Sequence, residues 1–411
     1  MKLTINNIGK LKNAEVEING ITVIAGENNT GKSTVGKALW SIFNSFYKTD
    51  KQILNEKSKN IEEELTFINR SNLTNFQSYR NFREKIEKFV NEIFTDTDYF
   101  LKEGFLREKI MNVFGDVDEK IILEISENVR KILKIPNRKV IEQIVQNRLI
   151  TEFNNQVNNI YSNKLGEIKL EVKDSEYEVK LQNNEVIELT DEKFLNTEAL
   201  YIDNPNIIDD VPTFFLDNSV INHKIHLINK LNNFKEENII KDIIIKEKLE
   251  KVYEKLNDIM NGKFVKKNLG NVFYQKNKYE FNIKNLSMGL KTFAILKILL
   301  ENNSLKEKGT IILDEPEIHL HPEWQVLFAE LIVLLQKEFE MHILLTTHSP
   351  YFLKAIQVFS RKYEIFDKCK YYIGEIDGEE STIIDTTDNL ENIFYKLTIP
   401  FENLMNEEEV L

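Results

Sequence analysis

The chain has 411 residues, of which 42% are hydrophobic and 29% are charged, so it has enough apolar material for the core of one large domain or of two to three smaller ones. Its net charge of −12 excludes a protein that binds nucleic acid through its overall charge, so any DNA contact depends on a local basic patch or on a partner. The single cysteine, Cys369, excludes an internal disulfide.

Neither a signal peptide nor a membrane span is indicated by the sequence. The first residues alternate in the manner of strands and lack the apolar core of a signal peptide. The longest apolar runs, such as residues 293–300, are interrupted by charged residues such as Lys297 and are too short to cross a bilayer. We therefore expect a cytoplasmic protein without membrane contact.

The hydrophobic periodicity changes several times along the chain, between the two-residue repeat of strands and the three- and four-residue repeat of helices. In chain order it predicts strands at 3–8, 15–18 and 21–25, a helix at 32–47, helices over 50–165, a hairpin at 166–190, a strand and a proline-containing loop at 198–216, helices over 223–260 and a hairpin at 263–284. Alternating helices and strands continue to about residue 348, and a short tail with both kinds of element follows.

A phosphate-binding loop is predicted at residues 26–33, which read Gly-Glu-Asn-Asn-Thr-Gly-Lys-Ser between a strand and a helix. The glycines allow backbone N–H groups to surround a phosphate, and the helix points its positive end at the same anion. We expect Lys32 to reach the β- and γ-phosphates, Ser33 to hold Mg²⁺ through its hydroxyl, and Thr34 to lie near the α-phosphate. The predicted nucleotide-binding residues of this loop are Gly26, Asn28, Asn29, Thr30, Gly31, Lys32, Ser33 and Thr34.

A second motif is the apolar strand 310–313, which is followed by the carboxylates of Asp314 and Glu315. The carboxyl edge of a parallel sheet is where ligands bind in α/β proteins. We expect Asp314 to hold Mg²⁺, directly or through water, and Glu315 to polarise an attacking water. Taken alone, the pair would also fit a solvated acidic turn.

Two further motifs stand beside predicted helices and strands. Residues 285–291 precede a helix, so Ser287 and Gly289 are placed to cap it and to offer backbone N–H groups to an anion. An ordinary helix cap is the alternative interpretation. His348 ends a predicted strand that follows the acidic strand along the chain.

In this order, the motifs resemble those of ABC-type ATPases, and in particular of the SMC, RecF and OLD-like group. The resemblance implies that Ser287 and Gly289 bind the γ-phosphate held by the opposite subunit of a dimer, and that His348 is the switch histidine that contacts the γ-phosphate. Met288 departs from the glycine that many ABC proteins have at this position. Gln77 is the candidate for the switch glutamine.

The resemblance implies an α/β fold, namely an ABC-type P-loop ATPase head with a helical and β insertion between the Walker A helix and the signature motif. The head would comprise residues 1–47 and 264–411, and the mainly helical insertion with a small β-hairpin would comprise residues 48–263. The insertion is far longer than a transporter ATPase needs, and it does not sustain the heptads of an SMC coiled coil.

Residues 314–322 resemble the DEPExHLHP stretch of OLD, RecF and related defence ATPases, which lies across the dimer interface in ABC proteins. His319 and His321 alternate with apolar residues in this stretch. We favour packing and interface roles for the two histidines, with a metal pair as the alternative.

The resemblance implies an ATPase that uses ATP and Mg²⁺ and acts as a homodimer or a higher oligomer. Residues 349–411 are too few for the Toprim nuclease domain of OLD proteins, so we expect a separate effector protein, a nuclease or toxin, as in Septu-type and PARIS-type anti-phage systems. A RecF-like DNA-repair ATPase is the alternative, with basic clusters at 130–139 and 263–279 as candidate DNA contacts. A third hypothesis is a scaffold that binds ATP and barely hydrolyses it, against which Glu315 and His348 argue.

Overall fold

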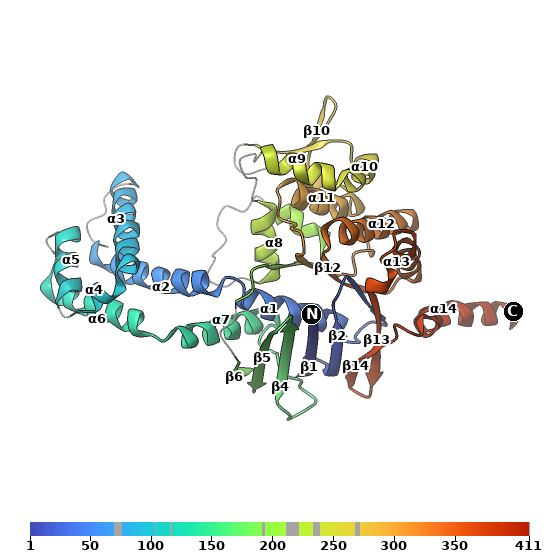
Figure 1. Ribbon diagram of the computed structural model, residues 1–411, viewed down its shortest axis with the longest axis horizontal. Helices are drawn as coiled ribbons and strands as arrows, with labels where there is room; N and C mark the ends of the chain where they lie inside the picture. The colour runs from blue at the N-terminus through green and yellow to red at the C-terminus, as the bar shows by residue number, and fades with distance from the viewer. Residues whose placement is uncertain are drawn as a thin grey trace. The chain divides into compact units, whose positions relative to one another are not determined.

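The computed structural model of the protein describes residues 1–69, 76–102, 104–115, 117–190, 194–210, 222–232, 239–267 and 272–410 (Figure 1). The chain forms two compact units. The first consists of Met1–Tyr47 and Val145–Leu411, and the second of Lys48–Ile144. Within the described residues, no helix is both long and apolar enough to cross a lipid bilayer.

The first unit is built around a sheet to which the described residues contribute eleven strands. Across the sheet the strands lie in the order β6 (Glu185–Leu189), β5 (Ser175–Gln182), β4 (Gly166–Val172), β1 (Lys2–Ile8), β2 (Leu11–Glu17), β14 (Glu380–Asp385), β13 (Cys369–Asp377), β3 (Ile21–Gly26), β12 (His342–Thr347), β11 (Thr310–Asp314) and β7 (Ala199–Ile202). From β13 to β7 every neighbouring pair is parallel, and from β6 to β2 every pair is antiparallel. The parallel strands β3, β11 and β12 are almost wholly buried, which explains their continuous apolar runs.

The C-terminal strands β13 and β14 join the two parts of the sheet. β13 pairs in parallel with β3, and β14 pairs in parallel with β2. Their backbone approaches the start of the phosphate loop so closely that a Cβ atom on Gly26 would lie 2.9 Å from the carbonyl oxygen of Gly374. The residues after 348 were predicted only as a short tail with both kinds of element. They therefore include a strand, β13, that supports the phosphate loop from beside β3.

Helices surround the parallel strands of the first unit. They are α1 (Lys32–Ser45), α7 (Asn137–Glu152), α8 (His223–Leu231), α9 (Ile239–Lys248), α10 (Glu250–Ile259), α11 (Met288–Glu301), α12 (Pro322–Phe339), α13 (Pro350–Lys362), α14 (Leu390–Val410) and the 3-10 helices η2 (Pro205–Asp210), η4 (Ile283–Asn285) and η5 (Phe366–Lys368). A small antiparallel sheet contains β10 (Tyr279–Asn282), β9 (Val272–Lys276) and β8 (Lys263–Lys266). Figure 1 shows α8, α11, α12 and α13 grouped near β12, at the opposite end of the unit from β4 and β5.

Helix α1 packs against strands of both parts of the sheet, including β1 and β4 on one side and β7 and β11 on the other. Most of its residues are therefore buried, including Val35, Trp40 and Phe43, in contrast to a surface helix with one apolar face. Gly36 permits the closest approach, because a Cβ atom there would lie 3.1 Å from the Ile312 side chain on β11. The start of α1 is thereby fixed against the sheet.

The second unit has a core of its own, formed by its helices. These are α2 (Thr49–Thr66), the 3-10 helix η1 (Phe67–Asn69), α3 (Phe76–Thr95), α4 (Thr97–Leu101), α5 (Phe105–Phe114), α6 (Glu119–Lys134) and the first part of α7. Ile61, Phe89, Phe100 and Val129 are among the buried residues of this core. Within one helix the buried residues recur at three and four positions, as Ile122, Ile125 and Val129 do on α6, which is the pattern that predicts helices here.

The two compact units differ in extent from the domains expected from the sequence. Residues 48–263 were expected to form one insertion, but the second compact unit ends at Ile144. The segment 166–190 is not an isolated hairpin, because its three strands extend the main sheet through the pairing of β4 with β1. β7 likewise belongs to the main sheet, through its pairing with β11. Alternating apolar residues reveal a strand but do not identify the neighbour with which it pairs.

Candidate functional site

The predicted motifs meet at one edge of the parallel part of the sheet. β3, β12 and β11 are adjacent and parallel, so their carboxyl ends lie side by side. β3 ends at Gly26, β12 at Thr347 and β11 at Asp314. This edge is where the phosphate loop, the acidic pair and His348 follow their strands, as expected for a ligand site in an α/β sheet.

The phosphate loop connects β3 to α1 through backbone conformations that favour glycine. Gly26 has a φ of 147° and Gly31 a φ of 81°, and Asn29 also lies in the left-handed region with a φ of 66°. A side chain on Gly31 would meet Leu11, because its Cβ atom would lie 2.6 Å from that side chain. The two glycines of the motif are therefore required by both the backbone angles and the space.

Lys32 is the first residue of α1, and its side chain turns back over the loop. It is 4% exposed, and its Nζ donates to the carbonyl oxygens of Gly26 at 3.2 Å and Glu27 at 2.8 Å. The same Nζ lies 3.7 Å from a carboxylate oxygen of Glu315. Burial lowers the pKa of the Lys32 ammonium, and the carboxylates of Glu315 and Asp314 act in the opposite direction. A buried cation held mainly by carbonyl groups is well suited to receive an anionic ligand.

The Asp314 carboxylate accepts two hydrogen bonds from hydroxyl groups on neighbouring strands. Tyr201 on β7 donates to Oδ2 at 2.9 Å, and Thr346 on β12 donates to Oδ1 at 2.5 Å. Both donors are hydroxyl groups, and the carboxylate oxygens have further lone pairs for a ligand. Such an oxygen is the kind of ligand that Mg²⁺ prefers, and the half-buried Ser33 hydroxyl offers a second oxygen of this kind.

Glu315 adopts a φ of 49°, which is unusual for a residue with a side chain and is typical of functional sites. Its backbone N–H donates to the Thr346 hydroxyl at 3.0 Å. Its side chain is in hydrogen-bonding contact with the ring Nε2 of His348. This contact with His348 lowers the pKa of the Glu315 carboxyl and outweighs the opposing effect of burial. Glu315 is therefore ionised near neutral pH, as a general base must be.

Glu317 holds the end of β12 in place through two hydrogen bonds. Its side chain is 3% exposed and accepts hydrogen bonds from the Thr347 hydroxyl and, at 3.0 Å, from the backbone N–H of His348. Burial raises the pKa of the Glu317 carboxyl. The sequence assigns no role to Glu317, although it lies within the stretch that follows Asp314.

Ser287 and Gly289 stand at the start of α11, which packs against η2 and α8. Ser287 is the N-cap, and its Oγ accepts from the Leu290 N–H at 3.5 Å, so Ser287 caps this helix. A Cβ atom on Gly289 would lie 3.0 Å from the Trp324 ring, which explains the need for glycine. Ser287 is exposed and available to a ligand from outside the chain.

The other predicted residues differ in how far the structure describes them. Asn28 and Asn29 are exposed on the loop, and Thr30 is buried with its hydroxyl bonded to the Glu27 carbonyl at 2.9 Å. Thr34 is half-buried in the first turn of α1. Gln77 lies on α3 in the second unit and its side chain is outside the described residues, so its role stays a prediction.

His319 and His321 are both exposed. In the described part of the chain, no group of three or more His, Cys, Asp or Glu side chains is arranged to hold a metal ion. The metal pair considered for these histidines therefore receives no support from the coordinates.

Two residues of the site are not identified by sequence patterns. Tyr201 and Thr346 hold the Asp314 carboxylate, but both occur within apolar strands whose neighbours the sequence does not reveal. A weak signal for Tyr201 is its position near the end of a predicted strand, directly before the polar residues that follow Ile202.

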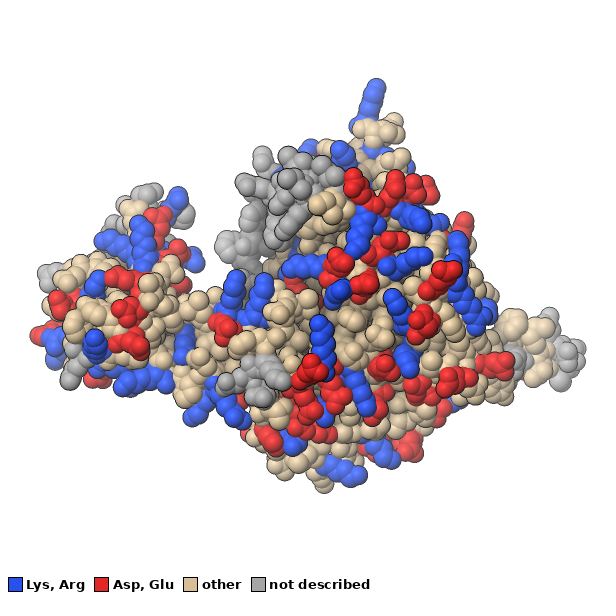
Figure 2. Space-filling model, in the orientation of Figure 1, with Lys and Arg blue, Asp and Glu red and all other residues tan. Residues whose placement is uncertain are grey.

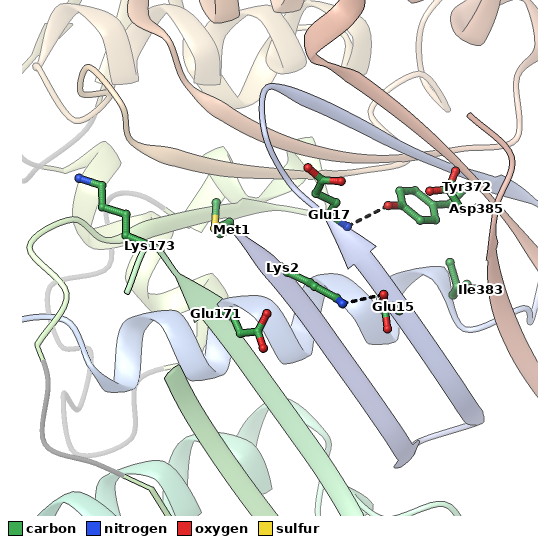
Figure 3. Close-up of a pocket in the computed structure, with 9 residues that line it drawn as sticks. All are labelled: Met1, Lys2, Glu15, Glu17, Glu171, Lys173, Tyr372, Ile383 and Asp385. Atoms are coloured by element: carbon green, nitrogen blue, oxygen red, sulfur yellow. Dashed lines mark hydrogen bonds and ion pairs between the residues drawn. The ribbon is translucent and has the colours of Figure 1, made fainter. Parts of the chain in front are cut away.

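A hollow of about 500 Å³ lies elsewhere on the first unit and holds none of the predicted residues (Figure 3). It is lined by residues of β1, β2, β4, β13 and β14, where Lys2 pairs with Glu15 at 2.7 Å and the Glu17 N–H donates to the Tyr372 hydroxyl at 2.9 Å. Its lining carries charges of both signs and none of the phosphate-loop, acidic-pair or histidine motifs. We assign the candidate site to the strand ends instead.

The fold and this site define a P-loop nucleotide-binding protein. Residues 1–353 match a family model described as an AAA ATPase domain. The chain therefore belongs to this family and is an ATPase, and the expected α/β P-loop ATPase fold is confirmed.

Several known proteins are similar to the chain, two of them over shorter stretches. A probable ATPase of retron Vc95 from Vibrio cholerae serotype O1 biovar El Tor is 32% identical over 107 residues, which are 23% of this chain and 20% of that protein. An OLD nuclease from Thermus scotoductus is 29% identical over 123 residues, which are 30% of this chain and 23% of that protein. The chain thus spans about a fifth of the length of these relatives. An SMC head domain from Thermotoga maritima is 12% identical, with a TM-score of 0.38 and coverage of 93% of this chain and 97% of that one.

Proposed function

We propose that this ATPase forms a dimer on binding ATP and that its hydrolysis of ATP controls a separate effector, a nuclease or toxin, in bacterial anti-phage defence. The observation that carries the proposal is the meeting of Lys32, Asp314, Glu315 and His348 at adjacent strand ends. This set contains a cation for phosphate, an oxygen ligand for a metal and a candidate general base.

In the proposed nucleotide complex, Lys32 exchanges its bonds to the Gly26 and Glu27 carbonyls for bonds to the β- and γ-phosphates. The backbone N–H groups between Asn28 and Ser33 surround the phosphates, because the first N–H groups of a helix have no acceptor inside the helix. Ser33 and Asp314 would hold Mg²⁺, which when bound neutralises phosphate charge.

Glu315 is the proposed general base. Its carboxylate, kept ionised by the contact with His348, accepts a proton from the attacking water. His348 would exchange part of this contact for the γ-phosphate and would thereby report the presence of ATP. The backbone of His348 is held by Glu317, so its imidazole has a fixed starting point.

A second copy of the chain is proposed to bring Ser287 and Gly289 to the γ-phosphate. Exposed apolar side chains beside the site support a partner surface, because Ile318 is 60% exposed and Tyr351 is 67% exposed. His319 and His321 lie exposed in the same stretch as Ile318 and would belong to this surface.

The role in defence rests on the relatives. Their names identify a retron ATPase and an OLD nuclease. The matched stretches cover about a fifth of these proteins, so their activities beyond ATP hydrolysis are carried to this chain only as a proposal. Control of a separate effector is the form of this proposal that fits an ATPase head.

The test compares Glu315→Gln with Lys32→Ala. We expect Glu315→Gln to form a dimer with ATP and Mg²⁺ that persists in size-exclusion chromatography with light scattering, because binding is kept and hydrolysis is blocked. Lys32→Ala is the matched control and should stay a monomer with no nucleotide bound. A monomeric Glu315→Gln protein that still binds ATP would contradict the dimer.

The effector is tested by purifying tagged Glu315→Gln protein with ATP and Mg²⁺ from the native host. A stoichiometric nuclease or toxin-like chain, absent from the Lys32→Ala purification, would support effector control. Recovery of DNA or replication proteins without such a chain would contradict it.

A RecF-like DNA-repair ATPase is the second candidate. It is favoured by the exposed basic side chains of Lys131, Lys134 and Lys139 on α6 and α7. Figure 2, however, shows acidic and basic side chains interspersed over one face of the first unit, with no extended basic stripe there. Salt-sensitive, ATP-stimulated DNA binding that is lost in a variant with these three lysines changed to glutamine would favour this candidate.

A further inference from the structure

Tyr201 contacts the acidic site from the neighbouring strand. Its side chain is 1% exposed, and its hydroxyl donates to Asp314 Oδ2 at 2.9 Å. A buried hydroxyl without a partner is costly, so this hydrogen bond fixes both groups at once. The hydroxyl also lies against α1, because a Cβ atom on Gly36 would be 3.2 Å from it. Tyr201 therefore has little freedom to move away from Asp314.

The Tyr201 ring is held in turn by His223, the first residue of α8. The two rings stack with their centroids 4.4 Å apart and their planes at 28°. His223 is 5% exposed, so this contact is shielded from water. His223 also packs against Trp40 of α1. The centroids of these two rings are 6.2 Å apart, and their planes meet edge-on at 77°. The ring of Tyr201 thus has a defined platform.

Two carboxylates fix the imidazole of His223. Its Nδ1 lies 2.5 Å from Glu152 Oε1 at the end of α7, and its Nε2 lies 3.1 Å from Asp203 Oδ2 just after β7. The backbone N–H of His223 donates to the second oxygen of Glu152 at 3.2 Å. These contacts outweigh burial and raise the pKa of His223 to about 9, so the ring is a cation at neutral pH. Lys224 adds a further positive charge 3.6 Å from Asp203.

We propose that Tyr201 is a positioning residue for Asp314, and that the ion-paired His223 acts through Tyr201 by holding its ring in place. The proposal rests on the proposed role of Asp314 as a ligand of Mg²⁺. The physical reason is that a metal-binding carboxylate works best when a neighbouring donor fixes its orientation before the metal arrives. Thr346 donates to the other oxygen of Asp314, so the carboxylate is held from both neighbouring strands.

In this proposal Glu152 and His223 support the nucleotide site indirectly, through the residues between them and Asp314. The order of contacts runs from Glu152 on α7 through His223 on α8 and Tyr201 on β7 to Asp314 on β11. A change at any step moves the carboxylate by way of the next. Loss of a supporting partner of this kind lowers metal affinity or activity by about 10- to 100-fold in other metal sites.

The first variant is Tyr201→Phe, which removes only the hydroxyl. We expect the Mg²⁺ concentration for half-maximal ATP hydrolysis to rise about 10-fold or more. A readout independent of turnover is the affinity for Mn²⁺ in the presence of a non-hydrolysable ATP analogue, followed by electron paramagnetic resonance, which should weaken to a similar extent. ATP affinity measured without divalent ion should stay within about 2-fold, because Tyr201 has no proposed contact with the nucleotide.

The matched control is Tyr177→Phe. Tyr177 on β5 is also 1% exposed, but it packs on Phe46 and lies in the antiparallel part of the sheet. We expect its loss of a hydroxyl to leave both Mn²⁺ affinity and Mg²⁺ dependence unchanged. If Tyr177→Phe weakens Mn²⁺ binding as much as Tyr201→Phe does, the positioning role is wrong. The loss would then be a general effect of removing a buried hydroxyl.

Asp314→Asn distinguishes failure of this inference from failure of the proposed function. If Asp314→Asn loses Mn²⁺ binding and Tyr201→Phe binds Mn²⁺ like the parent protein, the inference alone is wrong. If Asp314→Asn keeps normal Mn²⁺ binding, Asp314 does not hold the metal and the proposed function of the site is wrong.

His223→Asn tests the second step, and it will lower stability because it removes the cation beside Glu152 and leaves Asp203 with Lys224 alone. It is therefore compared within the Tyr201→Phe background at a temperature where every variant is folded by circular dichroism. We expect His223→Asn to weaken Mn²⁺ binding in the parent protein and to have no further effect once the Tyr201 hydroxyl is absent. Additive losses would show that His223 does not act through Tyr201.

Discussion

The carboxylate of Glu315 at the end of β11 is in hydrogen-bonding contact with the imidazole of His348 at the end of β12. The two residues are neighbours because β11 and β12 pair in parallel and end at the same edge of the sheet. The contact ties the candidate general base to the candidate phosphate sensor.

Because of this contact, substitutions at the two positions should not be additive. We expect Glu315→Gln to lower the rate of ATP hydrolysis by about 10²- to 10⁴-fold, the usual contribution of a general base. His348→Ala should cause a smaller loss, and adding it to Glu315→Gln should change the rate little further. Phosphate release at saturating ATP measures all three. Unaltered turnover in Glu315→Gln would remove Glu315 from the mechanism.

Glu317 offers a matched pair of substitutions. Glu317→Ala leaves the Thr347 hydroxyl and the His348 N–H without their buried acceptor, which costs about 1–3 kcal/mol for each unpaired group. Glu317→Gln keeps one acceptor oxygen and should be much closer to the parent protein. Urea denaturation gives the free energy of unfolding and phosphate release gives activity. The prediction is wrong if the two variants lose stability equally.

Gly289→Ala should separate nucleotide binding from assembly. The new Cβ atom would lie 3.0 Å from the Trp324 ring and 3.1 Å from the His319 carbonyl, so these neighbours or the start of α11 must move by a few tenths of an ångström. We expect ATP affinity of the single chain to stay normal, while the ATP-dependent dimer of the Glu315→Gln protein is lost. Met288→Ala at the neighbouring position is the control and should keep the dimer. A dimer of undiminished stability in Gly289→Ala would exclude this helix start from the interface.

His223 should make stability depend on pH. Its folded-state pKa of about 9 lies above the ordinary value of 6.5, so the folded state binds the proton more tightly than the unfolded state. The stabilisation, about 3 kcal/mol for a shift of this size, is fully present below about pH 6.5 and is lost as the pH rises through 9. Unfolding in urea at a series of pH values from 6 to 10 measures it. In His223→Asn this decline should be reduced, and an unchanged decline would assign it to other groups.

The sequence by itself predicted the candidate residues of the site and determined the local elements that carry them. The spacing of Gly26, Gly31 and Lys32 is readable because a phosphate loop requires these residue types at fixed positions between a strand and a helix. Asp314, Glu315 and His348 are readable because polar residues directly after apolar strands lie at a sheet edge. The order of these motifs along the chain also indicated the family resemblance.

Only the tertiary structure decided which strands are neighbours and which side chains support the site. Strands 166–189 and 369–385 read as local features, yet they pair with β1, β2 and β3 far away in the chain. Tyr201 is in an apolar strand like many others, and it reaches Asp314 only because β7 pairs with β11. The periodicity of apolar residues along a strand indicates which side chains are buried. This periodicity does not indicate the partner strand, because long-range pairing depends on the packing of the whole sheet.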